Sequence, residues 1–480
     1  AQGQPTEIFR LPIIFLLSLF VPVNNIRLVF IFSMFLVGGV GMYFYLSRIW
    51  LAQKSDLWKR WLASLGSIFY LLHILTLQQF YISFEMFMVQ FAFLPFLLMS
   101  IHALLNKLSI KNVFYFIALQ FLIAPSAHTQ TVFYLAVLFS LIYSFFLTLQ
   151  KKNLWHAIRM SFLVGLLTFF ANSYWIFPNL YYSFHNAHYV QESRDNQLFA
   201  PESVWSIREA GTIENLTSGM HYLFSWQDYS FEKEKHELIF NEWQDHFSQP
   251  LVIYSMRILG VITLLGFLIT IFSKDKDKKR WAIIAMYLFC FIFIWIDLLP
   301  TSKILDELYK SGTFREAFRN PFTKLSILYS FVSIILFITV VEKTILGLIG
   351  TKKLKKLTSL FAIIIFSSLF LSQFIISWPS FKGHFISEKL QIKYPGQYWE
   401  MFDYLETRDK DLRVLQLPQF THAGWEYYDW QFLEEGNGYQ GMGFYYFGFP
   451  QAFLNRDSDR WIETSDFFYY ELKHALDSYN

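Results

Sequence analysis

Three basic residues in the second half of the chain have the spacing of an anion-binding clamp. Arg315 and Arg319 lie four residues apart in the stretch S-G-T-F-R-E-A-F-R-N-P-F-T-K, and Lys324 closes it. Thr313 and Glu316 have capping-box spacing, so we expect a short surface helix with both guanidinium groups on one face. Such a pair could hold a phosphate by forked hydrogen bonds, or it could simply reach lipid head groups.

Acidic residues and histidines form a second group of candidates. Glu85 lies in a short turn between two apolar stretches, and Asp297 lies near the end of another. A carboxylate in such a place is costly unless it is paired or faces water, so a functional role and a structural pairing with an arginine are both open. His128, in P-S-A-H-T-Q, could be a base, a ligand or a turn residue, and the turn is the simpler interpretation. A divalent metal is possible, although His185 and His188, at i, i+3 spacing, have no evident third ligand.

The last part of the chain interleaves aromatic side chains with glycines and acids. The stretch G-W-E-Y-Y-D-W contains Trp425, Tyr428, Asp429 and Trp430, and Tyr439 follows in G-Y-Q-G-M-G-F-Y-Y. Aromatic faces can stack on sugar rings while carboxylates bond the hydroxyl groups, which would make these residues a glycan site. For most of them, the core of a small domain or an anchor at a membrane interface is the simpler expectation.

The composition indicates that lipid solvates much of this chain. Of 480 residues, 54% are hydrophobic, only 16% are charged and 56 are phenylalanine. A soluble domain of this size needs more surface charge. The single cysteine, Cys290, excludes a disulfide within the chain. The sequence contains no Walker A motif, no G-x-S-x-G elbow, no H-E-x-x-H and no dinucleotide fingerprint, and we expect no nucleic-acid partner.

The apolar stretches predict an all-α polytopic membrane protein with about ten transmembrane helices, since a bilayer core needs about 20 apolar residues per helix. Ile8–Phe20 is too short to span comfortably and is predicted to lie in the interface. The candidate spans are Leu28–Trp50, Ala63–Tyr81, Phe87–Leu105, Val113–Ala124, Thr131–Leu149, Ile158–Asn179, Leu251–Phe272, Trp281–Leu299, Lys324–Val341 and Leu357–Ser377.

Every second connection is basic, which predicts a cytoplasmic location for these loops. Residues 182–250 carry 11 Asp and Glu against 4 Lys and Arg, and residues 378–480 carry 16 against 9, so both are expected outside. The predicted parts are an outer loop 1–27, transmembrane helices 28–181, an outer insert 182–250, transmembrane helices 251–377 with an outer connection 300–323, and an outer domain 378–480. That last domain is expected to be small and mixed α/β, with a helix at Tyr398–Glu406 and a strand at Arg413–Leu417.

This layout resembles the GT-C superfamily of membrane glycosyltransferases. Gly-rich residues 37–43 are similar to the first helix common in bacterial members, and Phe314–Lys324, Tyr427–Trp430 and Gly438–Gly441 resemble the branch related to α-(1→3)-arabinofuranosyltransferases. The resemblance implies a bacterial plasma membrane enzyme of cell-envelope biogenesis, a hexosyl- or pentosyltransferase. It would move a sugar from a polyprenyl-phosphate donor to a glycan or lipid-linked acceptor on the outer face. The basic clamp would bind the donor phosphate, and the tail aromatics would bind the acceptor.

One departure from the family concerns the general base. In this class the catalytic carboxylate follows the first transmembrane helix, whereas here Glu7 is the only acid before residue 50. We therefore interpret the chain as lacking its natural start and expect the base upstream of Ala1, with Glu85 as the candidate inside the chain. Two other classes stay open: a lipid-linked-glycan flippase or other transporter, which would need more intramembrane ionisable residues, and a non-catalytic glycan-binding scaffold.

Overall fold

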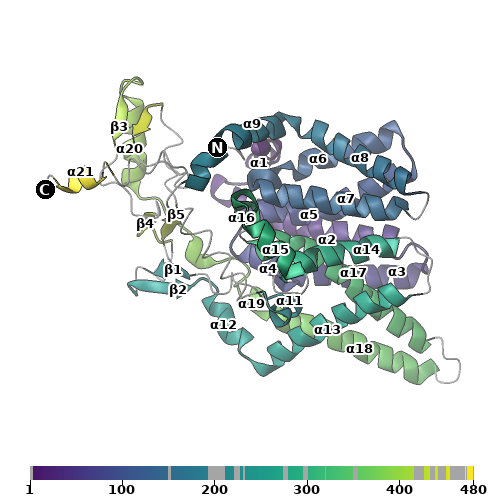
Figure 1. The fold of residues 1–480 in the computed structure, drawn as a ribbon. Coiled ribbons are helices and arrows are strands. Elements are labelled where there is room, and N and C mark those ends of the chain that lie inside the picture. Colours follow the sequence, from purple (N-terminus) through teal and green to yellow (C-terminus); the bar gives the residue numbers. More distant parts are fainter. Residues whose placement is uncertain are drawn as a thin grey trace.

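A bundle of long helices makes up most of the protein, and the strands and the C-terminus lie at one end of it (Figure 1). We refer to that end as the tail end, and to the opposite end, where α2 ends and α3 begins, as the basic end. The computed structural model describes residues 4–149, 153–192, 211–220, 227–230, 233–273, 279–295, 301–318, 320–349, 355–415, 426–432, 438–441, 450–454, 471 and 473–478.

Among the residues described, seven helices are long and apolar enough to cross a membrane, and the bent pair α3 (Asp56–Leu72) and α4 (Ile74–Tyr81) makes an eighth if it is one span. A mostly helical, multi-pass membrane protein is thereby confirmed. Two further helices of the bundle, α14 (Lys279–Ile294) and α18 (Lys355–Ile376), have shorter apolar parts within the described residues. The seven are α2 (Ile26–Tyr45, with turns Val23–Asn25 before it and Leu46–Trp50 after it), α5 (Glu85–Asn106), α6 (Ile110–Ile123, continued by Ala124–His128), α7 (Gln130–Leu149), α8 (Leu154–Ala171), α13 (Pro250–Phe272) and α17 (Pro321–Ile349).

Two expected spans are interrupted at single polar residues. The stretch predicted as Ala63–Tyr81 bends by 44° at His73, whose Nδ1 accepts the Leu75 N–H at 3.2 Å and so caps α4. The stretch predicted to run to Asn179 breaks at Asn172, where α8 ends. The Asn172 side chain donates to Gln120 at 3.2 Å and accepts from the Trp175 indole at 3.0 Å. Local side-chain hydrogen bonds compete with the helical ladder at both breaks.

Helix α17 is the centre of the bundle. In its candidate span, 94% of the residues are buried, and it contacts α3, α7, α13, α14 and α18. Aromatic rings fill much of the space around it: Phe337 of α17 stacks on Phe69 of α3 at 4.4 Å between ring centroids. Close approach of α13 and α17 is possible because Gly266 has no side chain at the contact.

The N-terminal segment lies across the tail end as two short elements, a 3-10 turn Gln4–Phe9 and α1 (Leu11–Ser18). Helix α1 is only eight residues long and leaves Leu11 and Phe15 exposed. An exposed apolar helix too short to span fits the predicted interfacial location.

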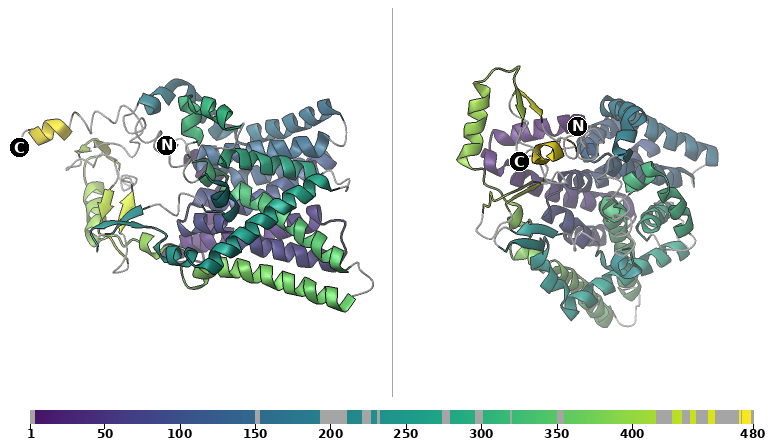
Figure 2. Two further views of the ribbon diagram at one scale, coloured as in Figure 1. Left: turned by 60° about the horizontal axis from the view of Figure 1, so that its bottom comes forward. Right: turned by 60° about the vertical axis from the view of Figure 1, so that its left-hand side comes forward.

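The insert and the tail dock together on α4 at the tail end (Figures 1 and 2). Trp243 donates its indole N–H to the His384 carbonyl at 3.1 Å, and Ser387 donates its N–H to the Tyr81 carbonyl at 3.0 Å. The remaining elements are α9 (Ser173–Glu192), α11 (Ile213–Ser218), the antiparallel hairpin β1 (Gln227–Ser230) and β2 (Lys235–Leu238), α12 (Asn241–Phe247), α15 (Thr301–Tyr309), α16 (Gly312–Phe318), α19 (Trp378–Phe381), α20 (Gly396–Glu406), the parallel pair β3 (Arg413–Leu415) and β6 (Ala452–Leu454), the antiparallel pair β4 (Glu426–Tyr428) and β5 (Tyr439–Gly441), and α21 (Lys473–Ser478).

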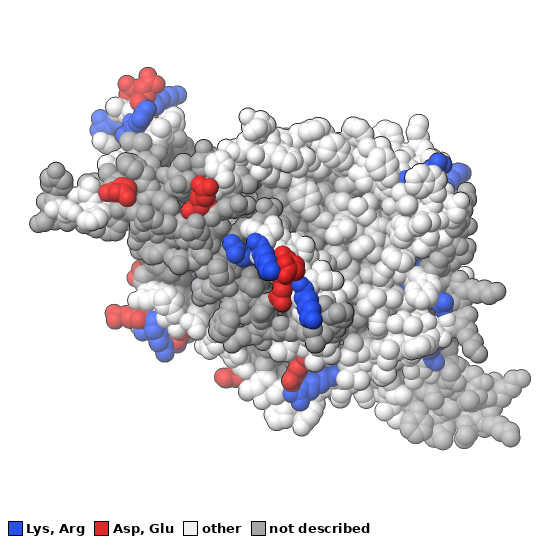
Figure 3. Space-filling view, viewed as in Figure 1, with Lys and Arg blue, Asp and Glu red and all other residues white. Residues whose placement is uncertain are grey.

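Charge is distributed unevenly between the two ends. On the face shown in Figure 3, the described residues of the basic end show Lys and Arg and no acidic side chain, whereas those of the tail end show both signs. This is the asymmetry from which the sequence predicts a cytoplasmic basic end.

Candidate functional site

A cavity of about 210 Å³ opens at the tail end of the bundle, where separate stretches of the chain meet. They are the N-terminal segment, the first turn of α2, the start of α5 and the 3-10 turn after α6. The cavity brings together five ionisable side chains, which we call the polar cluster: Glu7, Arg10, Arg27, Glu85 and His128.

The turn between α4 and α5 places Glu85 in this cavity. Ser83 has a positive φ of 58°, and Phe84 donates its N–H to the Gln79 carbonyl at 3.0 Å, which closes the turn sharply. Glu85 then begins α5, where the helix dipole favours a negative charge. Arg27 lies in the first turn of α2, where a positive charge is unfavourable, so the nearby carboxylate compensates for it.

Glu85 is held by two guanidinium groups. Its Oε1 accepts from Nε of Arg27 at 2.8 Å, and its Oε2 forms an ion pair with Arg10. Arg27 also donates to the Ser83 carbonyl at 3.4 Å. Because a guanidinium group contacts each oxygen, both oxygens of the carboxylate are already engaged and neither is placed to take a proton from a substrate. The geometry therefore favours the structural pairing with arginine over a role for Glu85 as base.

Glu7 bridges an arginine and a histidine. Its Oε2 lies 2.6 Å from Nε of Arg10, and its Oε1 lies 3.4 Å from Nδ1 of His128. The His128 side chain is half exposed, at 51%. A proton on Nδ1 faces the carboxylate, which leaves the lone pair of the neutral ring on Nε2. No ion pair among the described residues involves Nε2 of His128.

Aromatic packing fixes the position of Glu7. The neighbouring Phe9 ring stacks on Phe121 of α6 at 4.4 Å between centroids and meets Tyr174 of α9 edge-on at 5.5 Å. These contacts hold the 3-10 turn of Gln4–Phe9 against the bundle, beside the turn that carries His128. A short N-terminal segment therefore has a defined place at the mouth of the cavity.

No family model, curated protein or solved structure matches the chain. The polar cluster and the layout of the helices are therefore the features that bear on the function of this chain. Glu85 and His128 were singled out in the sequence, but Glu7 was set aside and Arg10 and Arg27 were missed. All five residues of the polar cluster lie near the ends of apolar stretches of the sequence. Only this distribution could have indicated that they meet in the folded chain.

The structure describes only part of the predicted basic clamp. Arg315 lies on α16, and its Nε is buried without a hydrogen-bond partner among the described residues. Lys324 is buried on α17 and donates to the Ala317 carbonyl, so it caps the end of α16. Arg319, the second guanidinium of the clamp, lies outside the described residues.

Two other predicted positions, Asp297 and Trp425, also lie outside the described residues. Among the described tail residues, Tyr428, Trp430 and Tyr439 pack on one another. Tyr428 stacks on Trp430 at 4.6 Å, and Trp430 lies 5.9 Å from Tyr439 between ring centroids. This mutual packing favours the core interpretation for these three rings. The Asp429 side chain between them in sequence is exposed.

The tail rings lie next to the polar cluster. The ring of Tyr394 lies 5.7 Å from that of Trp430 between centroids. The positive charge of Arg27 also acts on the Tyr394 phenol. Burial raises the pKa of the Tyr394 phenol, and the positive charge of Arg27 opposes that rise.

The described residues offer no metal centre. Among them, no group of three or more His, Cys, Asp and Glu side chains could hold a metal ion. In the polar cluster the guanidinium of Arg10 contacts both carboxylates and so occupies the place of a bridging cation. His185, noted for its spacing from His188, lies 4.4 Å from Tyr181 between ring centroids, with the two rings tilted by 43°.

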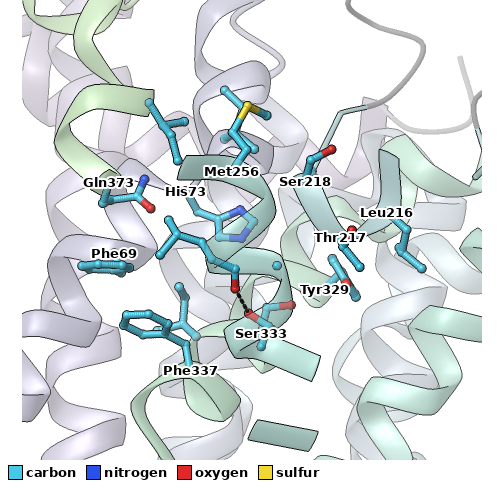
Figure 4. Close-up of a pocket in the computed structure, with 17 residues that line it drawn as sticks. Phe69, His73, Leu216, Thr217, Ser218, Met256, Tyr329, Ser333, Phe337 and Gln373 are labelled. Carbon is cyan, nitrogen blue, oxygen red and sulfur yellow. Dashed lines mark hydrogen bonds between the residues drawn. The ribbon is translucent and has the colours of Figure 1, made fainter. Parts of the chain in front are cut away.

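A second, smaller cavity of about 40 Å³ lies where α3 bends into α4 (Figure 4). Figure 4 shows the imidazole of His73 in the middle of the lining side chains, with Phe69 and Phe337 on one side and Thr217 of α11 on the other. Gln373 of α18 also lines it and donates to the Leu72 carbonyl at 2.5 Å. This volume has room for a water molecule and is too small for a sugar ring.

Proposed function

We propose that this chain is a membrane glycosyltransferase that acts on the outer face of the bacterial plasma membrane. It takes a sugar from a polyprenyl-phosphate donor and transfers it to a cell-envelope glycan or lipid-linked acceptor. The topology predicted from the sequence has about ten crossings with the basic end in the cytoplasm, and in that topology the cavity and the tail would lie on the outer side. The polar cluster is the single observation that carries the proposal, since it unites a basic imidazole with two guanidinium groups at the membrane edge.

His128 is the proposed general base. Its Nε2 accepts the proton of the acceptor hydroxyl as that oxygen bonds to the anomeric carbon of the sugar. Glu7 orients the imidazole and stabilises the positive charge that the ring acquires, as a carboxylate does beside a catalytic histidine. In this proposal Glu7 is the carboxylate that the family resemblance requires, and it acts through the imidazole of His128 and not directly on the acceptor.

The arginines act on the leaving group. The bond between the anomeric carbon and the phosphate oxygen breaks, and the electron pair leaves with the polyprenyl phosphate. Arg10 and Arg27 stabilise this developing charge, while Glu85 holds both guanidinium groups in place before the substrate binds. Arg315 and Arg319 are the proposed second contact for the donor phosphate, supported by the unpartnered Nε of Arg315 among the described residues.

The test is turnover by the purified chain in liposomes supplied with a panel of polyprenyl-phosphate-linked pentoses and hexoses. Release of polyprenyl phosphate is the readout. His128→Asn and Glu7→Gln should each lower kcat by about 10²–10⁴-fold, with KM nearly unchanged. The double variant should be little worse than either single variant, because the two residues act as a unit. His156→Asn, at the basic end of α8, is the matched control and should keep full activity.

Two results would overturn this proposal. Full activity in His128→Asn would remove the imidazole from the chemistry. Movement of a lipid-linked sugar across the liposome membrane, without release of polyprenyl phosphate from any donor, would make the chain a transporter.

A further inference from the structure

A row of polar side chains lies between α4 and α17 in the tail-end half of the bundle. Near the ends of both helices, the Gln79 amide donates to Ser326 at 2.9 Å. Deeper in the bundle, His73 and Ser333 line the same cavity of about 40 Å³, which we call the His73 cavity (Figure 4). The two helices are antiparallel, so these two contacts lie roughly 10 Å apart along both axes. We call the polar side chains between and including them the polar seam: His73, Thr76, Gln79, Ser326, Ser330 and Ser333.

Two side chains of the polar seam lack the hydrogen bonds that burial requires. Thr76 is fully buried, and its hydroxyl has no hydrogen-bond partner among the described residues. A helical threonine can donate to the carbonyl four residues earlier, but that carbonyl belongs to Leu72 before the bend and accepts from Gln373. The Oε1 atom of Gln79 is likewise buried, and no described group donates to it. A buried polar group of this kind is normally satisfied by ordered water.

The His73 cavity has space for such water. Nδ1 of His73 accepts the Leu75 N–H, so Nε2 of the neutral ring carries the hydrogen and is a donor. Ser333 and the Tyr329 phenol, which lies 3.3 Å from the Tyr287 hydroxyl, supply further polar groups to the cavity and its surroundings. One water needs about 10–15 Å³ and two to four polar partners, so the cavity has room for about two or three molecules.

Aromatic rings close the polar seam toward the basic end. Phe69 of α3 and Phe337 of α17 both line the His73 cavity, and their rings stack at 4.4 Å between centroids. Each ring lies one helical turn from the last polar side chain of its stretch. In the other direction, Thr323 lies one turn before Ser326, in the first turn of α17. The polar face therefore reaches the tail end of the bundle and stops at the aromatic pair.

We propose that the polar seam holds a file of internal water molecules, which links the His73 cavity with the solvent at the tail end. Nε2 of His73 donates to a water in the cavity, and the Thr76 hydroxyl and Oε1 of Gln79 bond to waters further along the file. Such a file lets a buried imidazole exchange its proton with one side of the membrane only. It leads into the bundle and not through it. The proposal does not depend on the transferase activity.

The test places a thiol along the polar seam and asks whether Ag⁺, an ion close to water in size, reaches it. Thr76→Cys, Ser326→Cys and Ser333→Cys should each bind one additional Ag⁺ per chain in detergent, counted by native mass spectrometry. Their uptake should be at least about tenfold faster than that of a thiol in a closed site, which reacts only when the structure opens locally.

Ser100→Cys is the matched control for a closed site. Ser100 is a fully buried serine of α5, and its hydroxyl donates to the Leu97 carbonyl at 2.7 Å. The wild-type chain gives the background, since it contains His73 and the fully buried Cys290.

Three results would overturn the proposal. Uptake in all three seam variants at the rate of Ser100→Cys would show a dry seam. Reaction of Thr76→Cys and Ser326→Cys without Ser333→Cys would disconnect the cavity, and reaction of Ser333→Cys alone would exclude entry from the tail end.

If a cysteine variant fails to fold, electron cryomicroscopy of the wild-type chain in nanodiscs decides the matter. At a resolution that shows ordered water, we expect density within hydrogen-bond distance of Nε2 of His73 and of the Thr76 hydroxyl. An empty cavity and seam in that map would equally overturn the proposal.

Discussion

Replacing Glu85 by Gln should destabilise the protein, because it removes the carboxylate that contacts both Arg10 and Arg27. At a charge separation of about 4 Å and an effective dielectric constant of about 20, each attraction is worth about 4 kcal/mol before solvent is considered. Arg27 is 66% exposed, so water screens that pair to at most about 1 kcal/mol.

The contact with Arg10 is less screened. The side chains of Arg10 and Glu85 are 27% and 23% exposed, which places the pair between a surface and a buried ion pair. Arg10 keeps Glu7 as a partner when Glu85 is lost, which limits the damage. We therefore expect a net loss of about 2 kcal/mol of unfolding free energy in E85Q.

The single cysteine provides the assay. Cys290 is fully buried in α14, so a thiol-reactive fluorophore reports unfolding as the protein is heated. E85Q should lower the midpoint by a few degrees. Glu214→Gln is the matched control, because Glu214 and its partner Arg257 are 60% and 52% exposed and their pair should contribute nothing measurable. Equal midpoints for E85Q and E214Q would refute the reasoning and show that the cavity is screened like open surface.

Two further outcomes follow from the packing and from the tail. The methyl group added in Gly266→Ala would lie 2.2 Å from the Leu336 carbonyl oxygen, so the substitution should lower the free energy of unfolding by about 1–3 kcal/mol. In Gly165→Ala the nearest atom to the new methyl group is 3.4 Å away, so this control should be neutral in the same thermal assay. Burial raises the pKa of Tyr398 to about 12 from an ordinary value of 10.0, so its contribution to stability should be complete below pH 10 and lost as pH rises to 12. Tyr398→Phe should remove part of this alkaline loss, measured by circular dichroism; an unchanged pH profile would contradict it.

The spans could be predicted from the sequence where one apolar stretch is one helix. Thr131–Leu149 and Leu251–Phe272 were expected, and the structure has Gln130–Leu149 and Pro250–Phe272. Hydrophobic thickness alone sets these lengths. The bend at His73 was missed because it depends on one side-chain hydrogen bond, which hydropathy does not register.

The candidate site was harder to predict than the fold. Glu85 and His128 were recognisable, because an ionisable group at the end of an apolar stretch is uncommon. Glu7 contacts His128 from far away in the sequence, and no local pattern encodes that meeting. The roles of Lys324 and Trp430 likewise depend on the neighbours that folding provides, a carbonyl in one case and a stacked ring in the other.

The central position of α17 has a consequence for biosynthesis. Six of the seven candidate spans precede it along the chain, yet it fills the space among helices made much earlier. Helices that insert one by one cannot complete their packing until this late segment leaves the ribosome. A nascent chain that stops before Pro321 would present to lipid the surfaces that α17 covers. Such intermediates are the natural clients of membrane chaperones and proteases, so the yield of this protein should depend on how promptly its last third is translated.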